Sequence, residues 1–95
     1  MKLFLDDIRE ASVGWVCVRD PHEAMDILTH GNVEEISFDH DLGEDKPSGY
    51  DVATWLEAQV IMGHLPCPKY LNCHSANPVG RKRIMQVIEN LERFQ

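Results

Sequence analysis

Short apolar runs alternate with helical patterns along this chain, and this alternation limits the folds that the chain can adopt. The runs lie at residues 3–5, 15–18, 35–38 and 69–73, and each has the length and composition of a β-strand. Helical patterns follow the second, third and fourth runs. Strands that alternate with helices are typical of a parallel sheet, so we predict an α/β fold with four strands and three helices.

Each predicted helix begins at residues suited to a helix start. Asp20 stands before Pro21, as an N-cap residue stands before a proline at the first helical position. Ser48 and Asp51 have the spacing of a capping box, in which each side chain accepts a backbone N–H group. Asn77 precedes another proline in the same way as Asp20 does. These residues place the predicted helix starts near positions 21, 49 and 78.

The connection between the first two predicted strands is unusually short. Only eight residues, 8 to 15, join them, whereas a crossover between parallel strands usually takes a dozen or more residues. Two arrangements stay open: either an extended segment makes the crossover, or the second strand is antiparallel. We favour the extended crossover.

Length and composition indicate one folded domain, residues 1–95, with a modest core. With 43% hydrophobic and 26% charged residues, the chain is too apolar to be disordered. No apolar run approaches the roughly 20 residues that span a bilayer, so we expect no membrane association. The three cysteines have no paired spacing, and the N-terminal apolar stretch is too short for a signal peptide. Both features favour the cytoplasm.

Charge is distributed unevenly along the chain. Residues 1–57 hold 14 acidic and 4 basic side chains, whereas residues 58–95 hold 2 acidic and 5 basic ones. With a net charge of −7, the chain has no basic stripe for an extended nucleic-acid groove. A single phosphate held between a cation and a few basic groups stays compatible with this distribution. The alternative is that both halves simply present solvated charged surfaces.

Two acidic clusters follow two of the predicted strands. Asp6 and Asp7 end the first strand, and Asp39 and Asp41 follow the third. Ligands of open α/β sheets bind beyond the carboxyl ends of the strands, and adjacent strands would bring these carboxylates together. Such crowding is unfavourable unless a cation or protons relieve it. Oxygen ligands suit Mg²⁺ or Mn²⁺, so we predict one of these cations; the alternative is that the acids cap helices or turns.

The start of the last helix has the features of an anion site. Free N–H groups at residues 77–80 and the helix dipole both favour a phosphate there. Arg81 follows in the first turn with two more cations behind it, although positive charge at this end opposes the dipole. A bound anion would relieve this conflict; otherwise these side chains extend into solvent or pair with acids. The candidate phosphate ligands are Ser75, Asn77, Gly80, Arg81 and Arg9.

Two histidines are candidates for proton transfer. His74 ends the fourth strand beside Ser75, and His40 lies between two acids. An unperturbed imidazole titrates near pH 6.5, so either ring could act as a general acid or base. Arg9 has two interpretations that the sequence does not separate: a salt-bridge partner of Asp7 or a phosphate ligand.

Three segments together resemble a known family. They are residues 5–9 (LDDIR), 38–43 (FDHDLG) and 74–81 (HSANPVGR). The pattern is similar to a shortened response-regulator receiver domain, and more closely to the cyclic-phosphate-processing receiver-like family. In receivers, the equivalents of Asp6 and Asp7 help to bind Mg²⁺. The equivalent of Asp39 accepts a phosphoryl group, which the equivalent of Ser75 contacts.

The resemblance implies a truncated receiver or flavodoxin-like fold in two or three layers, with a mostly parallel sheet in the order 2-1-3-4. It also implies a role with cyclic or terminal phosphates, so the expected partner is a small phosphorylated ligand or an RNA end. Unlike full receivers, the chain lacks room for the first helix and has no fifth strand. One face of the sheet is then thinly covered. We expect the last helix, or a second copy of the chain in a homodimer, to cover it.

We therefore predict a metal-dependent phosphoesterase. The four aspartates of the two acidic clusters would hold Mg²⁺ or Mn²⁺, and His74 or His40 would transfer a proton. The alternative is a receiver-like module that binds phosphate or signals without catalysis, with Asp39 as its phosphoacceptor. A purely structural interaction domain, which would bind no divalent cation, is the third possibility.

Overall fold

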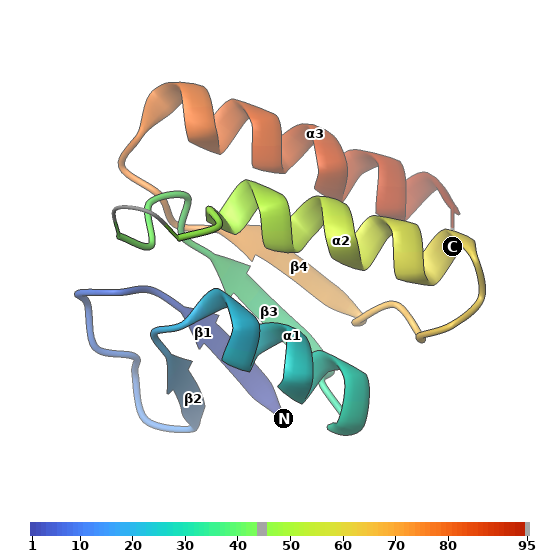
Figure 1. Ribbon diagram of the computed structural model, residues 1–95, viewed down its shortest axis with the longest axis horizontal. Coiled ribbons are helices and arrows are strands. Elements are labelled where there is room, and N and C mark those ends of the chain that lie inside the picture. The colour runs from blue at the N-terminus through green and yellow to red at the C-terminus, as the bar shows by residue number, and fades with distance from the viewer. Residues whose placement is uncertain (44–45, 95) are drawn as a thin grey trace.

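Four parallel strands form one sheet, as the alternation of apolar runs predicts. The computed structural model describes residues 1–43 and 46–94. In chain order the strands are β1 (Lys2–Leu5), β2 (Trp15–Val18), β3 (Glu35–Phe38) and β4 (Tyr70–Cys73). They lie in the order β2-β1-β3-β4, and each neighbouring pair is parallel. All four carboxyl ends therefore lie at the same edge of the sheet (Figure 1). The predicted strand order is confirmed.

The connection between β1 and β2 contains no helix. It ends in a turn, where the N–H of Trp15 donates to the carbonyl of Ser12 at 3.1 Å. β2 then pairs with β1 in parallel register, with Leu3 opposite Val16. The predicted extended crossover is thus confirmed, and the antiparallel alternative is wrong.

The three helices start where the sequence predicts. They are α1 (Pro21–His30), α2 (Gly49–Ile61) and α3 (Pro78–Phe94). Asp20 accepts a backbone N–H of the first turn of α1 at 2.8 Å, and Ser48 and Asp51 form a capping box at α2. At α3, Oδ1 of Asn77 accepts the N–H of Gly80 at 3.0 Å. These caps satisfy donors that a first helical turn leaves free. Within residues 1–43 and 46–94, no helix is long and apolar enough to cross a membrane.

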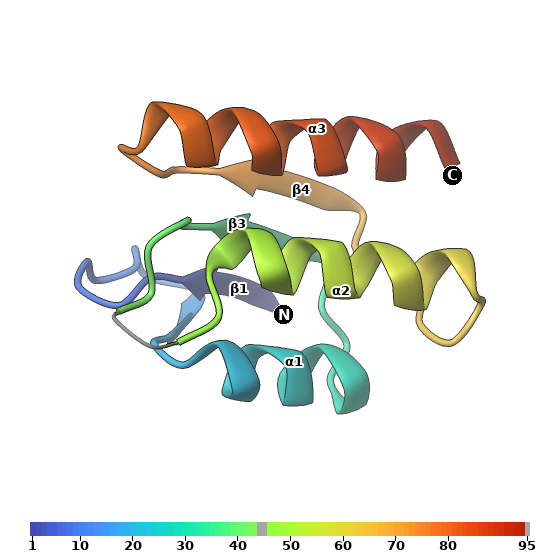
Figure 2. The ribbon, with the colours of Figure 1, turned by 45° about the horizontal axis from the view of Figure 1, so that its top comes forward.

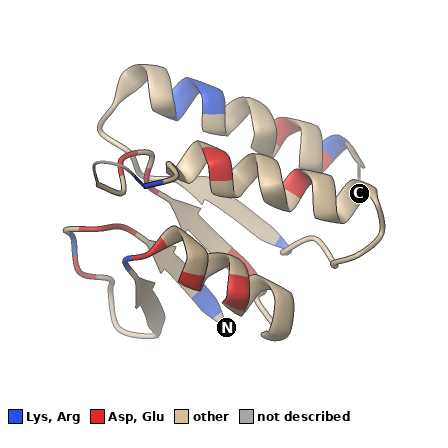
Figure 3. Cartoon of the chain, in the orientation of Figure 1, with Lys and Arg blue, Asp and Glu red and all other residues tan. Residues whose placement is uncertain are grey.

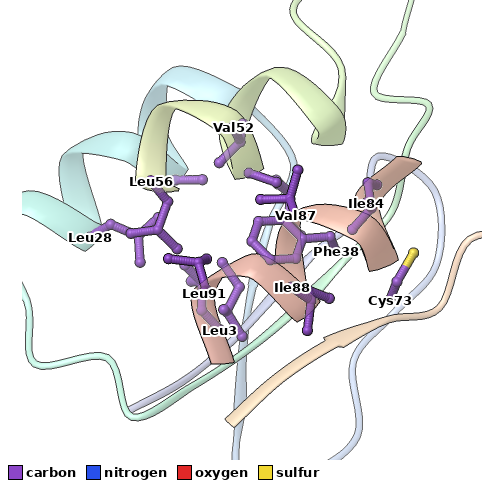
Figure 4. Packing of buried hydrophobic residues seen from close by; sticks show 14 of the residues in the cluster. Leu3, Leu28, Phe38, Val52, Leu56, Cys73, Ile84, Val87, Ile88 and Leu91 are labelled. Carbon is purple, nitrogen blue, oxygen red and sulfur yellow. The ribbon is translucent and has the colours of Figure 1, made fainter. Parts of the chain in front are cut away.

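All three helices pack against one face of the sheet (Figures 1 and 2). Strands direct alternate side chains to each face, so Leu3 and Leu5 are fully buried there beside their cross-strand neighbours Ile36 and Phe38. Burial of a side chain of this size contributes roughly 1.5–3 kcal/mol. Figure 4 shows the helix side chains that complete this core: Leu28, Val52, Leu56, Ile84, Val87, Ile88 and Leu91.

The opposite face of the sheet carries no helix in the described part of the chain, and we call it the open face. Its side chains form two rows across the strands: Trp15, Lys2, Glu35 and Tyr70, then Cys17, Phe4, Ser37 and Asn72. The fold therefore has two layers, and the expectation that the last helix covers this face is wrong. The reason is that the apolar stripe of α3 completes the core beside α2, whereas half of the eight side chains in the two rows of the open face are polar.

Candidate metal and phosphate site

Three residues that follow adjacent strands converge at the carboxyl edge of the sheet. Asp6, Asp39 and His74 come directly after β1, β3 and β4, whose last residues are paired in register. The ladder continues through them: the N–H of Asp39 donates to Leu5 at 2.9 Å, and that of His74 to Phe38 at 3.0 Å. Because successive side chains alternate, and Leu5 and Phe38 face the core, the three side chains turn to the open-face side. One ligand atom of each lies within 4.8 Å of the others.

The side chain of Asp6 is buried, with 1% of the residue's surface exposed. Oδ1 accepts the N–H groups of Ile8 and Arg9 at 2.9 and 2.8 Å, and Oδ2 lies 2.9 Å from Nε2 of His74. Burial alone would raise the pKa of the Asp6 carboxyl. The two backbone N–H groups and His74 outweigh burial, so the pKa is lowered from its usual value. Asp6 therefore carries a negative charge at neutral pH, as a cation ligand must.

His74 reaches from β4 across β3 to β1. Its Nδ1 lies 2.7 Å from Oγ of Ser37 in β3, and its ring stacks on Phe4 in β1 with the centroids 4.1 Å apart. When Nε2 donates to the Asp6 carboxylate, Nδ1 accepts the hydroxyl proton of Ser37. Sequence reasoning missed Ser37, because no local motif marks a serine that meets a histidine 37 positions away.

A pocket of about 220 Å³ opens beside this cluster, and we call it the acidic pocket. Its lining contains all four aspartates of the two predicted clusters: it comprises Asp6, Asp7, Ile8, Arg9, Asp39, Asp41, Ala76 and Asn77. Arg9 adds a positive charge, and its Nη1 donates to the carbonyl of His74 at 3.0 Å. Among the described residues no ion pair joins Arg9 to Asp7. The guanidinium group therefore remains available to a ligand in this pocket.

A second hollow, of about 330 Å³, shares Asp7 and Asp41 with the acidic pocket, and His40 and Lys46 also line it. Nδ1 of His40 lies 3.0 Å from Oδ1 of Asp41, and the amide of Asn77 donates to Oδ2 at 3.4 Å. His40, helped by Asn77, outweighs the effect of partial burial and lowers the pKa of Asp41. A candidate proton carrier, His40, and a positively charged side chain, Lys46, thus lie next to the acidic pocket.

Two glycines allow the helix starts to approach the Asp39–His40 turn. Gly49, the first residue of α2, lies against the carbonyl of Asp39 and donates its N–H to the carbonyl of His40 at 2.8 Å. Gly80, in the first turn of α3, lies against the ring of His40. A Cβ atom at either position would overlap these atoms. Gly80 was predicted as a phosphate ligand. In the structure it has a packing role, and its N–H is donated to Asn77.

Two further predicted phosphate ligands are not among the residues that line the acidic pocket or the adjoining hollow. Ser75 is buried, and its Oγ accepts the N–H of Asn77 at 3.1 Å. Arg81 donates from Nη1 to the carbonyl of Cys73 at 2.6 Å. Figure 3 shows the basic start of α3 and the acidic loops at the same end of the molecule. Phosphate binding by Ser75 and Arg81 stays a prediction.

The donor set of Asp6, Asp39 and His74 fits a divalent cation. Asp7 and Asp41, which were predicted as ligands with them, line the same pocket outside this cluster. His74 was predicted for proton transfer and not as a ligand. The position of His74 directly after β4, next to the strand that Asp39 follows, is a signal that could have marked it as a neighbour of Asp39, although not its contacts with Asp6 and Ser37. A nitrogen ligand beside two carboxylates suits Mn²⁺ better than Mg²⁺, which prefers oxygen.

Comparison with known families identifies the chain. It matches the family of cyclic-phosphate processing receiver domains over residues 1–90, and it therefore belongs to that family. The resemblance that the three sequence segments indicate is confirmed. The parallel sheet in the order β2-β1-β3-β4 with three helices agrees with a receiver or flavodoxin-like fold. Comparisons with curated proteins and with solved structures gave no match.

Proposed function

We propose that this domain opens the 2′,3′-cyclic phosphate of a nucleotide or an RNA end by a hydrolysis that depends on a divalent cation. One observation carries the proposal: Asp6 and Asp39 line the acidic pocket together with Arg9 and Asn77, and His74 lies beside both aspartates at its edge. This arrangement offers ligands for a cation and donors for phosphoryl oxygens within one cavity. Membership of the family adds the association with cyclic phosphates.

Arg9 and Asn77 would bind the phosphoryl oxygens. The guanidinium of Arg9 has five N–H donors, of which one is used on the carbonyl of His74. The amide of Asn77 contacts Asp41 at 3.4 Å, which is long for a hydrogen bond, so exchange for a phosphoryl oxygen would cost little. Lys46, in the adjoining hollow, supplies a second positive charge.

Asp6, Asp39 and His74 would hold the cation. When bound, it would polarise the phosphoryl group and stabilise the charge that develops on its oxygens. The backbone N–H groups of Ile8 and Arg9 keep Asp6 ionised and oriented before any cation arrives. As a ligand, His74 would take the tautomer in which Nδ1 donates to Oγ of Ser37, so that the lone pair of Nε2, 2.9 Å from Oδ2 of Asp6, faces the cation.

His40 is the better placed proton carrier, because its ring is paired with Asp41 beside the acidic pocket. In the proposed hydrolysis, a water oxygen forms a bond to phosphorus, and the bond from phosphorus to O2′ or O3′ breaks. His40 would accept the proton from the attacking water and deliver it to the leaving oxygen. The product is a phosphomonoester with one free ribose hydroxyl.

Turnover of 2′,3′-cyclic AMP with Mn²⁺ or Mg²⁺, followed by ion-exchange chromatography, tests this proposal. We expect adenosine 2′- or 3′-monophosphate as the product. His40→Gln should lower kcat by about 10²–10⁴-fold. Asp39→Asn should abolish the turnover that Mn²⁺ or Mg²⁺ supports. Asp26→Asn, which changes an exposed carboxylate on α1, is the matched control. A folded protein that opens no cyclic nucleotide with either cation would contradict the proposal.

Phosphoryl acceptance by Asp39 without hydrolysis is the second candidate function. Asp39 is partly exposed at the wall of the acidic pocket, and its Oδ1 accepts the N–H of His40 at 2.9 Å. This candidate predicts that acetyl phosphate with Mg²⁺ adds the mass of one phosphoryl group, that Asp39→Asn prevents the addition, and that no cyclic nucleotide is opened. An unchanged mass argues against it.

A further inference from the structure

We propose that the open face of the sheet binds the nucleobase of the substrate. The inference rests on the proposed function and extends the recognised group from the phosphate to the base. Its centre is a pocket of about 180 Å³ between the two rows of the open face, which we call the base pocket. The residues that line it are Phe4, Ser12, Trp15, Glu35, Ser37 and Asn72.

Two aromatic rings form the apolar part of the base pocket. Phe4 and Trp15 meet edge to face, with their centroids 6.2 Å apart. The core of the domain lies on the other side of the sheet and does not include these rings. Aromatic side chains on an uncovered sheet are a common platform for bases, and four-stranded sheets with helices on one face use them in RNA recognition.

The remaining wall of the base pocket is polar. Oδ1 of Asn72 accepts the N–H of Cys73 at 2.8 Å, which leaves the NH₂ group of its amide as a donor. Glu35 supplies hydrogen-bond acceptors, and the hydroxyl of Ser12 can either donate or accept a hydrogen bond. A nucleobase has a flat face to stack and both donors and acceptors at its edge. An apolar peptide side chain would leave these polar groups without partners, which is unfavourable.

His74 connects the base pocket with the acidic pocket. Its ring stacks on Phe4 and its Nδ1 contacts Ser37, and both of these residues line the base pocket. Its Nε2 contacts Asp6, which lines the acidic pocket. Alternate residues of a strand lie roughly 6.5 Å apart. One ligand can therefore reach from the phosphate site beside Asp39 to the base pocket within one or two rows of side chains.

The charge of the open face is compatible with a nucleotide. Lys2 lies over the ring of Trp15 at 5.8 Å, and Lys69 over that of Tyr70 at 5.4 Å. Glu35 is the acidic residue of the two rows, and it lies 3.9 Å from Lys2. The two rows therefore carry no net charge, on a chain whose net charge is −7. An anionic ligand is repelled less by these neutral rows than by the acidic remainder of the chain.

Kinetics with two esters test the base pocket. Glycerol 1,2-cyclic phosphate has the same five-membered cyclic phosphate as 2′,3′-cyclic AMP but no base. Trp15→Ala should raise KM for 2′,3′-cyclic AMP between about fivefold and 150-fold and leave KM for the glycerol ester unchanged. Trp15→Phe keeps a ring and should restore most of the affinity. Tyr70→Ala, which removes an exposed ring of the same face outside the base pocket, is the matched control.

Fluorescence gives a second measurement that does not need turnover or a change at Trp15. The chain has two tryptophans, so Trp55→Phe leaves Trp15 as the emitter. Adenosine 3′-monophosphate should quench this emission by stacking, whereas glycerol 2-phosphate should not. This fluorescence measurement tests the inference even if Trp15→Ala does not fold.

The outcomes separate the two proposals. If both cyclic esters are opened with equal efficiency, and adenosine 3′-monophosphate does not quench Trp15, the base pocket is refuted and the proposed function stands. If the folded protein neither opens nor binds either ester, the proposed function fails and the base pocket fails with it. If the nucleotide is opened with a lower KM than the glycerol ester, and Trp15→Ala removes this difference in KM, both proposals are supported.

Discussion

Gly80 lies so close to the ring of His40 that any side chain at this position must displace the ring. Overpacking of this kind typically costs about 1–3 kcal/mol. We predict that Gly80→Ala lowers the free energy of unfolding, measured by urea denaturation, by this amount. His40→Ala in the same chain should recover most of the loss, because it removes the atoms that the new Cβ meets. Strictly additive effects of the two substitutions would contradict this contact.

Gly49→Ala is the comparison for that experiment. Its Cβ would meet the backbone carbonyl of Asp39, which no side-chain deletion removes. The loss of stability should therefore be at least as large as for Gly80→Ala, and His40→Ala should not recover it.

Asp6 should make the stability of the fold depend on pH in the acid range. Its folded-state pKa lies below the usual value of 3.8, so its ionised form stabilises the fold above the unfolded-state pKa. That contribution is lost as the pH falls through the folded-state pKa. Urea denaturation between pH 6 and pH 2 should therefore show a steeper acid loss for the native chain than for Asp6→Asn. Asp26→Asn, an exposed control, should follow the native chain, and parallel curves for all three would refute the role of Asp6.

Single residues show where sequence reasoning succeeds and where it stops. The convergence of Asp6 with Asp39 was predictable, because both follow strands that the apolar runs mark. The contact of His74 with Asp6 and Ser37 was not, because it spans three strands and depends on the exact register. The direction of Arg81 was also beyond prediction, since a long side chain in the first turn can reach either a ligand or a nearby carbonyl, here that of Cys73.

At the scale of elements, the start of α2 depends on its capping box, in which Ser48 accepts the N–H of Asp51 at 3.2 Å. Ser48→Ala should lower the free energy of unfolding by about 0.5–2 kcal/mol, measured by thermal or urea denaturation. Ser48→Asp keeps a side-chain acceptor and should restore stability. Equal stability of the native chain and Ser48→Ala would mean that the packing of α2, and not its cap, determines where the helix begins.

Element bounds were predictable because each helix start has a capping residue and each strand a short apolar run. The position of α3 was not predictable from its own pattern, since its stripe of Ile84, Val87, Ile88 and Leu91 suits either face of a sheet. The contacts with α2 decide it: a core shared by both helices buries more apolar surface than the open face, half of whose row side chains are polar, could.

At the scale of the whole molecule, a sheet covered on one side leaves the open face to a ligand or a partner. A homodimer through this face stays a prediction, and it would cover the base pocket. Nucleotide and second copy should then compete, so sedimentation velocity should show less dimer when adenosine 3′-monophosphate is present. If the nucleotide does not change the amount of dimer, the dimer interface lies elsewhere on the molecule.

The central claim is that residues following three adjacent strands form one cation site. Titration with Mn²⁺, followed by the electron paramagnetic resonance signal of the free ion, tests it most directly. We predict one bound Mn²⁺ per chain, strongly weakened in Asp39→Asn and His74→Gln and unchanged in His64→Gln, which alters an exposed histidine in the segment between α2 and β4. No bound Mn²⁺ in the native chain, or binding that Asp39→Asn and His74→Gln leave intact, would contradict the account.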